Sequence, residues 1–376
     1  MSNQSRIRLE RVTKRWDATT AVNDISFDVT PGQFVILLGP SGCGKSTTLR
    51  MIAGLEEASS GRIHIGERDV TRLPPGDRGL SMVFQSYALF PHLSVADNIV
   101  FGLRSRKVPK AEQRERLARV AELVDLTDYL DRKPAKLSGG QRQRVALARS
   151  IISEHPICLM DEPLSNLDAR LRSDMRREIK ALQSRLNMTV IYVTHDQVEA
   201  MSMGDRVILM QHGKIVQDGT PDELYNRPAS AFAASFIGSP AMNLLPLVAG
   251  ETGAVIEGEP STPVAPMEAA GGHLGVRPED IELRPAASPG VPATVVSEEY
   301  LGADTIAYVE VGLHTLRVRL SGKPLLTGQP CSLFWASKNI HLFDANGLRR
   351  DDIPLSDFAP PIRSIPRPPA VGSFQH

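Results

Sequence analysis

Three short runs dominated by apolar residues stand out in the first 236 positions of the chain. They are Phe34–Leu38, Ile157–Met160 and Thr189–Val193, and each is bounded by polar residues, proline or glycine. Continuous apolarity is typical of strands that are buried on both faces, as in parallel sheets. Longer amphipathic stretches alternate with these runs, as crossover helices do. The pattern therefore predicts an α/β domain with a largely parallel sheet over residues 1–236.

A polar segment follows each apolar run directly. Gly39–Ser46 follows the first run, Asp161-Glu162 the second and Thr194–Asp196 the third. Open α/β sheets bind ligands at the carboxyl ends of their strands. Because all three segments come at such ends, we expect them to converge on one edge of the sheet and to form one site.

The pattern changes after about Phe236. Gly, Pro and Ala become frequent, and short alternating segments appear, such as Thr305–Val311 and Thr315–Leu320. Alternation of this kind is typical of half-buried antiparallel strands. Several such strands separated by turn residues predict a small all-β, OB-like domain over residues 237–352. The repeated prolines of residues 353–376 predict a disordered tail.

Composition and charge narrow the choice of partners. The 376 residues carry 43 Lys or Arg and 43 Asp or Glu, so no overall basic field favours binding to nucleic acid. The cysteines Cys43, Cys158 and Cys331 have no metal-type spacing and fit a reducing cytosol best. The apolar runs are far shorter than the roughly 20 residues that cross a bilayer. If the protein works at a membrane, we expect a partner to hold it there.

Gly39–Ser46 matches the pattern GxxxxGK(S/T), and its context fits. An apolar run precedes it, and a helix-forming run from Ser46 to Ala53 follows and ends at Gly54, a predicted helix C-cap. In such a P-loop, backbone N–H groups surround a phosphate, the lysine reaches the β- and γ-phosphates and the hydroxyl binds Mg²⁺. The predicted phosphate-binding residues are Gly39, Pro40, Ser41, Gly42, Cys43, Gly44, Lys45, Ser46 and Thr47.

A second glycine-rich segment begins at Leu137 and precedes a helical pattern over Arg142–Ile151. Its S-x-x-Q spacing predicts, by itself, a helix cap and no ligand. The longer string LSGGQRQR resembles the signature of ABC-type ATPases. In that family the signature of one subunit contacts the γ-phosphate of ATP on the P-loop of the other, in a head-to-tail homodimer. The resemblance assigns this contact to Ser138, Gly139, Gly140 and Gln141.

The remaining positions of the ABC pattern occur in order, and the resemblance implies their roles. Asp161 corresponds to the carboxylate that holds Mg²⁺, and Glu162 to the general base that orients the attacking water. Gln85 corresponds to the loop glutamine that senses Mg²⁺ and the γ-phosphate. His195 corresponds to the switch histidine that contacts the γ-phosphate. A single histidine after a strand is usually structural, and this alternative stays open for His195.

Two further positions match less specific parts of the pattern. Asp168, at the end of Ser165–Asp168, corresponds to the loop that crosses the dimer interface. Trp16 stands where the family places an aromatic residue against the adenine ring. A tryptophan near a strand is most often part of the core, so a core position is the alternative for Trp16.

The chain has one nucleotide-binding set, no membrane span and no long coiled coil between its two glycine-rich segments, so it resembles the separate ATPase subunits of importers. The resemblance implies ATP and Mg²⁺ as ligands, and a homodimer bound to two integral-membrane permease subunits at the cytoplasmic face of the bacterial inner membrane. A periplasmic or extracellular solute-binding protein would act through the permease. Gln85–His92 corresponds to the place where an apolar groove takes a short permease helix. The alternative is that these residues fill the helical subdomain, about residues 86–155.

The second predicted domain resembles the regulatory domain of carbohydrate importers. The matching segments are Gly238–Leu245, Val276–Ile281, Tyr300–Asp304 and His341–Asp344. The resemblance implies import of a small polar solute, sn-glycerol-3-phosphate, and the alternative is a sugar such as maltose or another oligosaccharide. Two other classes stay open, a soluble ATPase that acts on nucleic acid and a non-catalytic regulatory module.

Overall fold

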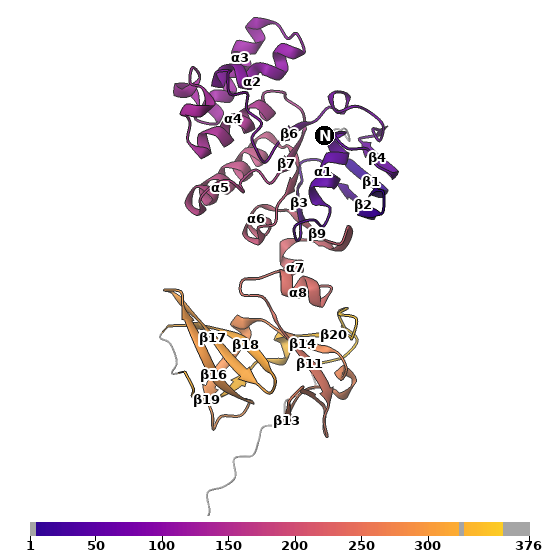
Figure 1. The fold of residues 1–376 in the computed structure, drawn as a ribbon, viewed down its shortest axis with the longest axis vertical. Coiled ribbons are helices and arrows are strands. Elements are labelled where there is room, and N and C mark those ends of the chain that lie inside the picture. The colour runs from indigo at the N-terminus through magenta and orange to yellow at the C-terminus, as the bar shows by residue number, and fades with distance from the viewer. Residues whose placement is uncertain (1–4, 323–326, 356–376) are drawn as a thin grey trace, which may run out of the picture. The chain divides into compact units, whose positions relative to one another are not determined.

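The computed structural model describes residues 5–322 and 327–355 (Figure 1). The chain divides into two compact units, the first ending at Leu224 and the second beginning at Tyr225. Most of the proline-rich segment predicted as a tail, from residue 356 on, lies outside the described residues. No helix in the described part of the chain is long and apolar enough to span a membrane.

A six-stranded sheet forms the centre of the first unit, in the order β10-β9-β3-β8-β7-β6. All neighbours in it are parallel except β10, which pairs antiparallel with β9. The three predicted apolar strands are the adjacent β3, β8 and β7, and every residue in them is buried. The predicted parallel sheet is therefore confirmed. The strands are β3 (Phe34–Leu38), β6 (Ser81–Val83), β7 (Ile157–Asp161), β8 (Thr189–Val193), β9 (Arg206–Gln211) and β10 (Lys214–Gly219).

A second, antiparallel sheet of this unit has the order β2-β1-β4-β5. Its strands are β1 (Ile7–Trp16), β2 (Thr19–Val29), β4 (Ser60–Ile65) and β5 (Arg68–Asp69). Side chains from both sheets and from α1 (Lys45–Ala53) form one buried cluster, which includes Leu9, Leu37 and Leu49. Helix α1 is thus fixed against both sheets by apolar burial, and its first residues follow β3 directly.

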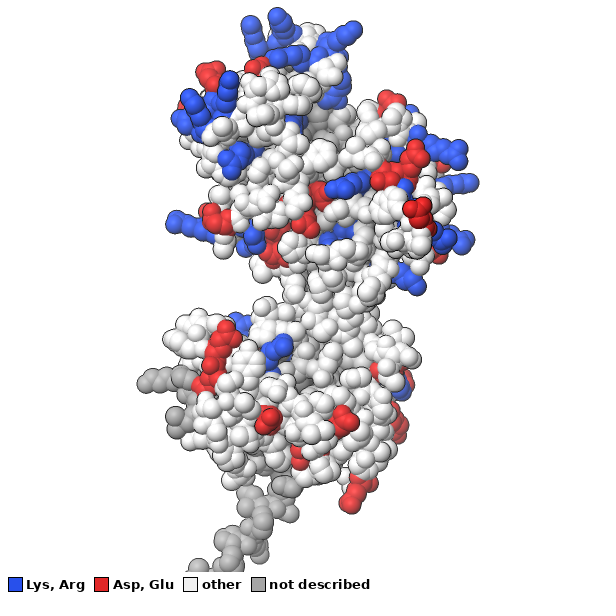
Figure 2. Space-filling model, in the orientation of Figure 1, with Lys and Arg blue, Asp and Glu red and all other residues white. Residues whose placement is uncertain are grey.

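Helices α2, α3 and α4 form a separate group beside β6 (Figure 1). Besides α1, the first unit contains the helices α2 (Val95–Ser105), α3 (Lys110–Leu123), α4 (Gly139–Ile151), α5 (Ala169–Leu186) and α6 (Gln197–Met203). Figure 2 shows Lys and Arg side chains gathered over α2 and α3. Several are paired with acids, as Arg104 is with Asp97 and Arg116 with Glu154. Such pairs of opposite charge are typical of solvated helix faces.

The second unit is built on two five-stranded antiparallel sheets, β13-β12-β11-β14-β20 and β15-β19-β16-β17-β18. The two alternating segments of the sequence are the neighbours β17 and β18, as predicted. The first sheet contains β11 (Asn243–Ala249), β12 (Ala254–Ile256), β13 (Glu259–Ala265), β14 (His273–Val276) and β20 (Ile340–Phe343). The second contains β15 (Glu282–Pro285), β16 (Val291–Tyr300), β17 (Asp304–Val311), β18 (His314–Ser321) and β19 (Pro330–Phe334).

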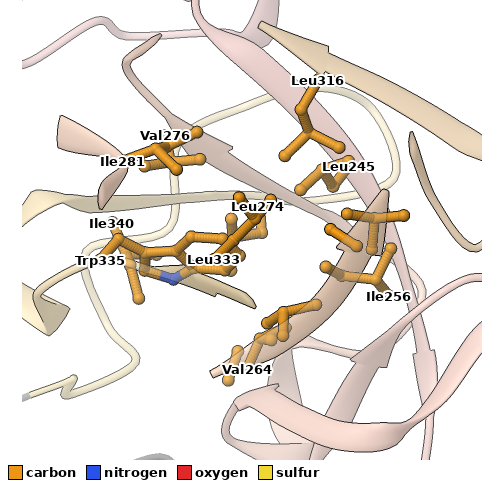
Figure 3. Close-up of a cluster of buried hydrophobic side chains, with 14 of the residues drawn as sticks. Leu245, Ile256, Val264, Leu274, Val276, Ile281, Leu316, Leu333, Trp335 and Ile340 are labelled. Carbon is orange, nitrogen blue, oxygen red and sulfur yellow. The ribbon is translucent and has the colours of Figure 1, made fainter. Parts of the chain in front are cut away.

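One buried cluster holds these two sheets together (Figure 3). Leu245 and Leu274 come from the first sheet, and Leu316 and Leu333 from the second. The prediction of a small β-rich domain after the α/β domain is confirmed. Short helices also occur: α7 (Pro221–Asn226), α8 (Ala231–Phe236) and the 3₁₀ helices Pro75–Asp77, Thr127–Tyr129, Pro134–Lys136, Met267–Ala269, Pro278–Asp280 and Ser337–Asn339.

Candidate nucleotide site

The three polar segments that follow β3, β7 and β8 meet at one edge of the sheet. The Ser46 hydroxyl donates a hydrogen bond to Asp161 Oδ1 at 2.7 Å, which joins the first segment to the second. His195 Nδ1 lies 3.3 Å from Glu162 Oε2, which joins the second segment to the third. The parallel order of the strands thus brings together residues that are far apart in the sequence, as expected for an open α/β sheet.

Two glycines of the P-loop occupy places that a side chain cannot enter. Gly39 has a φ of +147°, and a Cβ there would lie 2.2 Å from the carbonyl oxygen of Met210. Gly44 has a φ of +103°, and a Cβ there would lie 2.5 Å from the carbonyl oxygen of Ala21. Gly42 has a φ of +78° but open space beside it. The loop conformation therefore depends on glycine at all three places, because positive φ disfavours other residues.

Lys45 is folded back over its own loop. Its Nζ donates to the carbonyl oxygens of Gly39 and Pro40, each at 2.8 Å, and the side chain is buried. These two acceptors hold the ammonium group inside the loop, where a phosphate group would compete for it. Cys43 is also buried, and burial raises the pKa of its thiol although Lys45 opposes this shift. A buried thiol with a raised pKa suits the role of a small filling residue and not that of a reactive thiolate.

Ser46 and Asp161 place two oxygens where a hard cation can bind. The two oxygens are already within hydrogen-bond distance, and Asp161 ends β7 as a buried carboxylate. Mg²⁺ prefers one or two protein oxygens of this type together with water and substrate phosphates. Arg50 NH2 lies 3.7 Å from the other oxygen of Asp161, a contact that the sequence did not suggest. The sequence signal for this contact is that Arg50 follows Ser46 by four residues in the same helix, so both side chains lie on one helix face.

Gln85 lies beside the residues predicted as base and switch. Its Nε2 is 3.4 Å from Glu162 Oε2 and 3.3 Å from Ser165 Oγ. Glu162 has a φ of +45°, which is uncommon for a residue with a side chain, and its N–H donates to the carbonyl oxygen of Val193. The backbone of β8 thus holds the Glu162 turn. The structure brings Gln85, Glu162 and His195 together.

A buried carboxylate that the sequence analysis missed supports the turn around His195. Glu199, in α6, is 3% exposed and accepts hydrogen bonds from Thr194 Oγ1 at 2.7 Å and from Tyr192 Oη at 2.8 Å. Burial raises the pKa of the Glu199 carboxyl. Asp196 caps the same helix by accepting from the N–H groups of Val198 and Glu199. No local sequence pattern indicates this support, because the partners of Glu199 are hydroxyl groups that precede its helix.

The Ser138–Gln141 turn begins α4 with the predicted capping box. Ser138 Oγ accepts from the N–H of Gln141, and Gln141 Oε1 accepts from the N–H of Ser138. A Cβ on Gly140 would lie 2.9 Å from Leu171 Cδ1, so the turn packs closely on α5. Asp168 caps α5 by accepting from the N–H of Leu171. In the described part of the chain, no hydrogen bond joins this turn to the P-loop.

Trp16 lies at the end of β1 and is 44% exposed. The Lys14 ammonium lies 5.2 Å from the centre of its ring, within the range of a cation–π contact. The core alternative for Trp16 does not agree with this exposure. An exposed indole face is available for stacking on a base.

The segment after Gln85 contains both buried and exposed apolar side chains. Tyr87 is 7% exposed, whereas Leu89 and Phe90 are half-buried. The rings of Phe90 and Phe101 lie 4.4 Å apart, and Phe101, in α2, is 42% exposed. Some of these residues therefore fill the helical group, and others leave an apolar surface next to it.

Comparisons with known proteins agree with this geometry. A family model described as ABC transporter matches residues 22–165, and one described as TOBE domain matches residues 274–343. The chain is 48% identical to the trehalose/maltose import ATP-binding protein MalK of Thermococcus litoralis, over 90% of this chain and 97% of that protein. It is 49% identical to the sn-glycerol-3-phosphate import ATP-binding protein UgpC 2 of Agrobacterium fabrum, over 92% of this chain and 94% of that protein.

A solved structure resembles more than half of this chain. It is the dimeric, post-hydrolysis state of the ATP-binding cassette MJ0796 bound to ADP and Pi, with a TM-score of 0.51 and 29% sequence identity. The match covers 57% of this chain and 98% of that chain. With the parallel sheet, the P-loop and the β-rich second domain, these matches show that the chain belongs to the ABC transporter family, among its ATP-binding import proteins.

Proposed function

We propose that this chain is the ATP-hydrolysing subunit of an importer that carries a small polar solute, sn-glycerol-3-phosphate, into a bacterial cell. The observation that supports this proposal most is the joining of three separate segments at one edge of the sheet. Ser46 contacts Asp161, and Glu162 contacts both Gln85 and His195. This arrangement offers a phosphate cradle, a pair of cation ligands and a candidate base within one site.

The P-loop residues 39–47 bind the phosphates of ATP, and the exposed face of Trp16 stacks on adenine. Ser46 and Asp161 would hold Mg²⁺, with Gln85 near them, and the bound ion would neutralise phosphate charge. Glu162 accepts the proton of the attacking water. His195 contacts the γ-phosphate, held in place by the turn that Glu199 supports. The contact between Glu162 and His195 is compatible with both roles.

The Ser138–Gln141 turn serves the ATP of a second subunit. The turn lies at the N-terminus of α4, and the side chains of Ser138 and Gln141 form hydrogen bonds with backbone N–H groups of the turn itself. No hydrogen bond joins it to its own P-loop in the described residues. A head-to-tail homodimer would bring this turn and the Asp168 loop of one subunit to the ATP of the other. The dimeric state of the similar cassette MJ0796 supports such an arrangement.

Two integral-membrane permease subunits hold the homodimer at the cytoplasmic face of the inner membrane. The apolar surface of Phe90 and Phe101, to which the segment after Gln85 contributes, fits a short amphipathic permease helix. A solute-binding protein outside the membrane delivers the solute to the permease. ATP binding closes the dimer, and hydrolysis with product release reopens it.

The solute is proposed from the relatives. Several relatives named as sn-glycerol-3-phosphate import proteins match about nine-tenths of this chain at 47–49% identity. A sugar such as maltose is the second candidate, because the trehalose/maltose import protein is 48% identical over a similar length.

Reconstitution tests the proposal. The chain would be assembled with its permease subunits in proteoliposomes, and uptake of labelled sn-glycerol-3-phosphate, maltose and an unrelated amino acid would be measured with the binding protein and ATP present. We expect uptake of sn-glycerol-3-phosphate that stops when ATP is replaced by ADP. Uptake of maltose without uptake of sn-glycerol-3-phosphate would show that maltose is the solute, and the proposal of an importer would stand. ATP hydrolysis that responds to DNA or RNA and not to the permease would contradict the importer itself.

A further inference from the structure

Arg149 joins α4 to the segment that follows Gln85. Its NH1 donates to the carbonyl oxygen of Ala88 at 2.6 Å, and its NH2 donates to the carbonyl oxygen of Tyr87 at 2.7 Å. The planar guanidinium fork suits two successive carbonyl groups, whereas a lysine ammonium would act as a point charge. Arg149 lies in the last turn of α4, the helix that begins with the Ser138–Gln141 turn.

The backbone that Arg149 holds is unusual. Tyr87 has a φ of 63° and Ala88 a φ of 47°, so two consecutive residues with side chains adopt the left-handed region. For a residue with a side chain this conformation is less favourable than the ordinary backbone regions. A strained pair of this kind persists only where the surroundings hold it. The two charge-assisted hydrogen bonds from Arg149 are such a restraint.

The strained pair lies between the catalytic cluster and the apolar surface. On one side, Gln85 contacts Glu162 and Ser165. On the other, Asn98 of α2 is fully buried and exchanges hydrogen bonds with the N–H and carbonyl groups of Phe90. The segment is therefore fixed at both ends, and Tyr87–Ala88 is the part that depends on α4.

We propose that Arg149 is a positioning residue that couples occupation of the Phe90–Phe101 surface by a permease helix to the placement of the Ser138–Gln141 turn. This inference rests on the proposed importer function. A helix that presses on the segment displaces the Tyr87 and Ala88 carbonyl groups, and Arg149 moves with them. Because α4 is a rigid element of 13 residues, a shift at its last turn also shifts its first turn.

The test compares ATP hydrolysis by the isolated subunit with hydrolysis by the assembled transporter, at saturating ATP and solute. Arg149→Met removes both hydrogen bonds, and Arg149→Lys keeps the charge but loses the fork. Arg144→Met is the matched control, because Arg144 lies on the same helix but pairs with Glu178 and Asp125. We expect the permease-dependent stimulation to fall roughly 10-fold in Arg149→Met and less in Arg149→Lys, with ATP affinity within about 2-fold of wild type.

A rescue variant distinguishes positioning from general loss of structure. Ala88→Gly removes the cost of the left-handed conformation, so the double variant Arg149→Met/Ala88→Gly should regain part of the stimulation. It also gives a folded test protein if Arg149→Met alone unfolds, as a thermal melt would reveal. Permease-dependent stimulation at the wild-type level in Arg149→Met would overturn this inference and leave the proposed function standing. An equal loss of stimulation in Arg144→Met would do the same. A wild-type chain that no permease stimulates would remove the proposed function and the inference together.

Discussion

The hydroxyl of Ser46 and the carboxylate of Asp161 are 2.7 Å apart, although 115 residues separate them in the sequence. Ser46 lies at the start of α1, after the loop that follows β3, and Asp161 is the last residue of β7. Both strands are parallel neighbours of β8. The sheet, not a local motif, therefore sets the distance between these two oxygens. This distance makes them suitable as a shared pair of cation ligands.

Substitution of Asp161 should change the dependence of hydrolysis on Mg²⁺. Asp161→Asn keeps the shape and one oxygen but removes the charge that attracts the cation. We expect the Mg²⁺ concentration for half-maximal ATP hydrolysis to rise at least about 10-fold, and the maximal rate to fall. The measurement is a Mg²⁺ titration of hydrolysis at fixed ATP. Nucleotide binding in EDTA serves as the control and should stay unchanged. An unaltered Mg²⁺ titration would remove Asp161 as a ligand.

Glu162→Gln should separate ATP binding from hydrolysis. The amide keeps the size of the side chain but cannot accept a proton, so turnover should fall by at least roughly 100-fold while ATP affinity stays similar. We expect the variant to elute as a dimer from a sizing column when ATP is present. Glu178→Gln is the control, because Glu178 is a half-buried glutamate that pairs with Arg144. Turnover near the wild-type rate would exclude Glu162 as the base.

Trp16 should report nucleotide binding by its fluorescence. The chain has two tryptophans, and Trp335 is 7% exposed whereas Trp16 is 44% exposed. In Trp335→Phe the remaining emission comes from Trp16, and stacking on adenine should quench it with a saturable dependence on ATP. Trp16→Phe should retain most of the affinity, and Trp16→Ala should lose several-fold. An emission spectrum that ATP leaves unchanged would argue that the base lies elsewhere.

Buried apolar runs and local motifs made much of this site predictable. The strands at Phe34, Ile157 and Thr189 were recognisable because both of their faces are buried, and the capping box at Ser138 is a local hydrogen-bond pattern. Glu199 and Arg149 were not recognisable, because their partners come from other elements and are backbone or hydroxyl groups. The exposure of Trp16 depends on packing around the end of β1, which no local pattern encodes.

A substitution in the signature turn should act on the other subunit's ATP. In a mixed dimer, Ser138→Arg in one subunit places a bulky cation at the capping box and breaks the bond to Gln141. We expect loss of hydrolysis at the P-loop of the wild-type subunit. To assign sites, the Ser138→Arg subunit would also carry Lys45→Ala, which disables its own P-loop. Hydrolysis by this mixed dimer at half the wild-type rate would contradict a shared site, and near-complete loss would agree with it.

Glu199 should affect the rate through the placement of His195. Glu199→Leu removes the acceptor for Tyr192 and Thr194, so that the O–H donors of two buried hydroxyl groups lose their acceptor. We expect maximal hydrolysis to fall roughly 10- to 100-fold with little change in ATP affinity, since small displacements of reacting groups have effects of this size. Glu199→Gln keeps an acceptor oxygen and should retain most of the rate. A similar fall in the maximal rate in both variants would indicate that hydrolysis needs the negative charge of Glu199 and not the placement of His195.

The stability of Glu199→Gln should depend on pH in a direction fixed by the raised pKa of Glu199. Burial raises this pKa above its ordinary value of 4.5, so the folded protein holds the proton more tightly than the unfolded chain does. The contribution of Glu199 to stability is therefore lost as the pH rises from about 4.5 through the folded-state pKa. Glutamine does not titrate, so the melting temperature of the variant relative to wild type should increase over this interval and then level off. A relative melting temperature that falls with pH would show that the folded state favours the charged carboxylate.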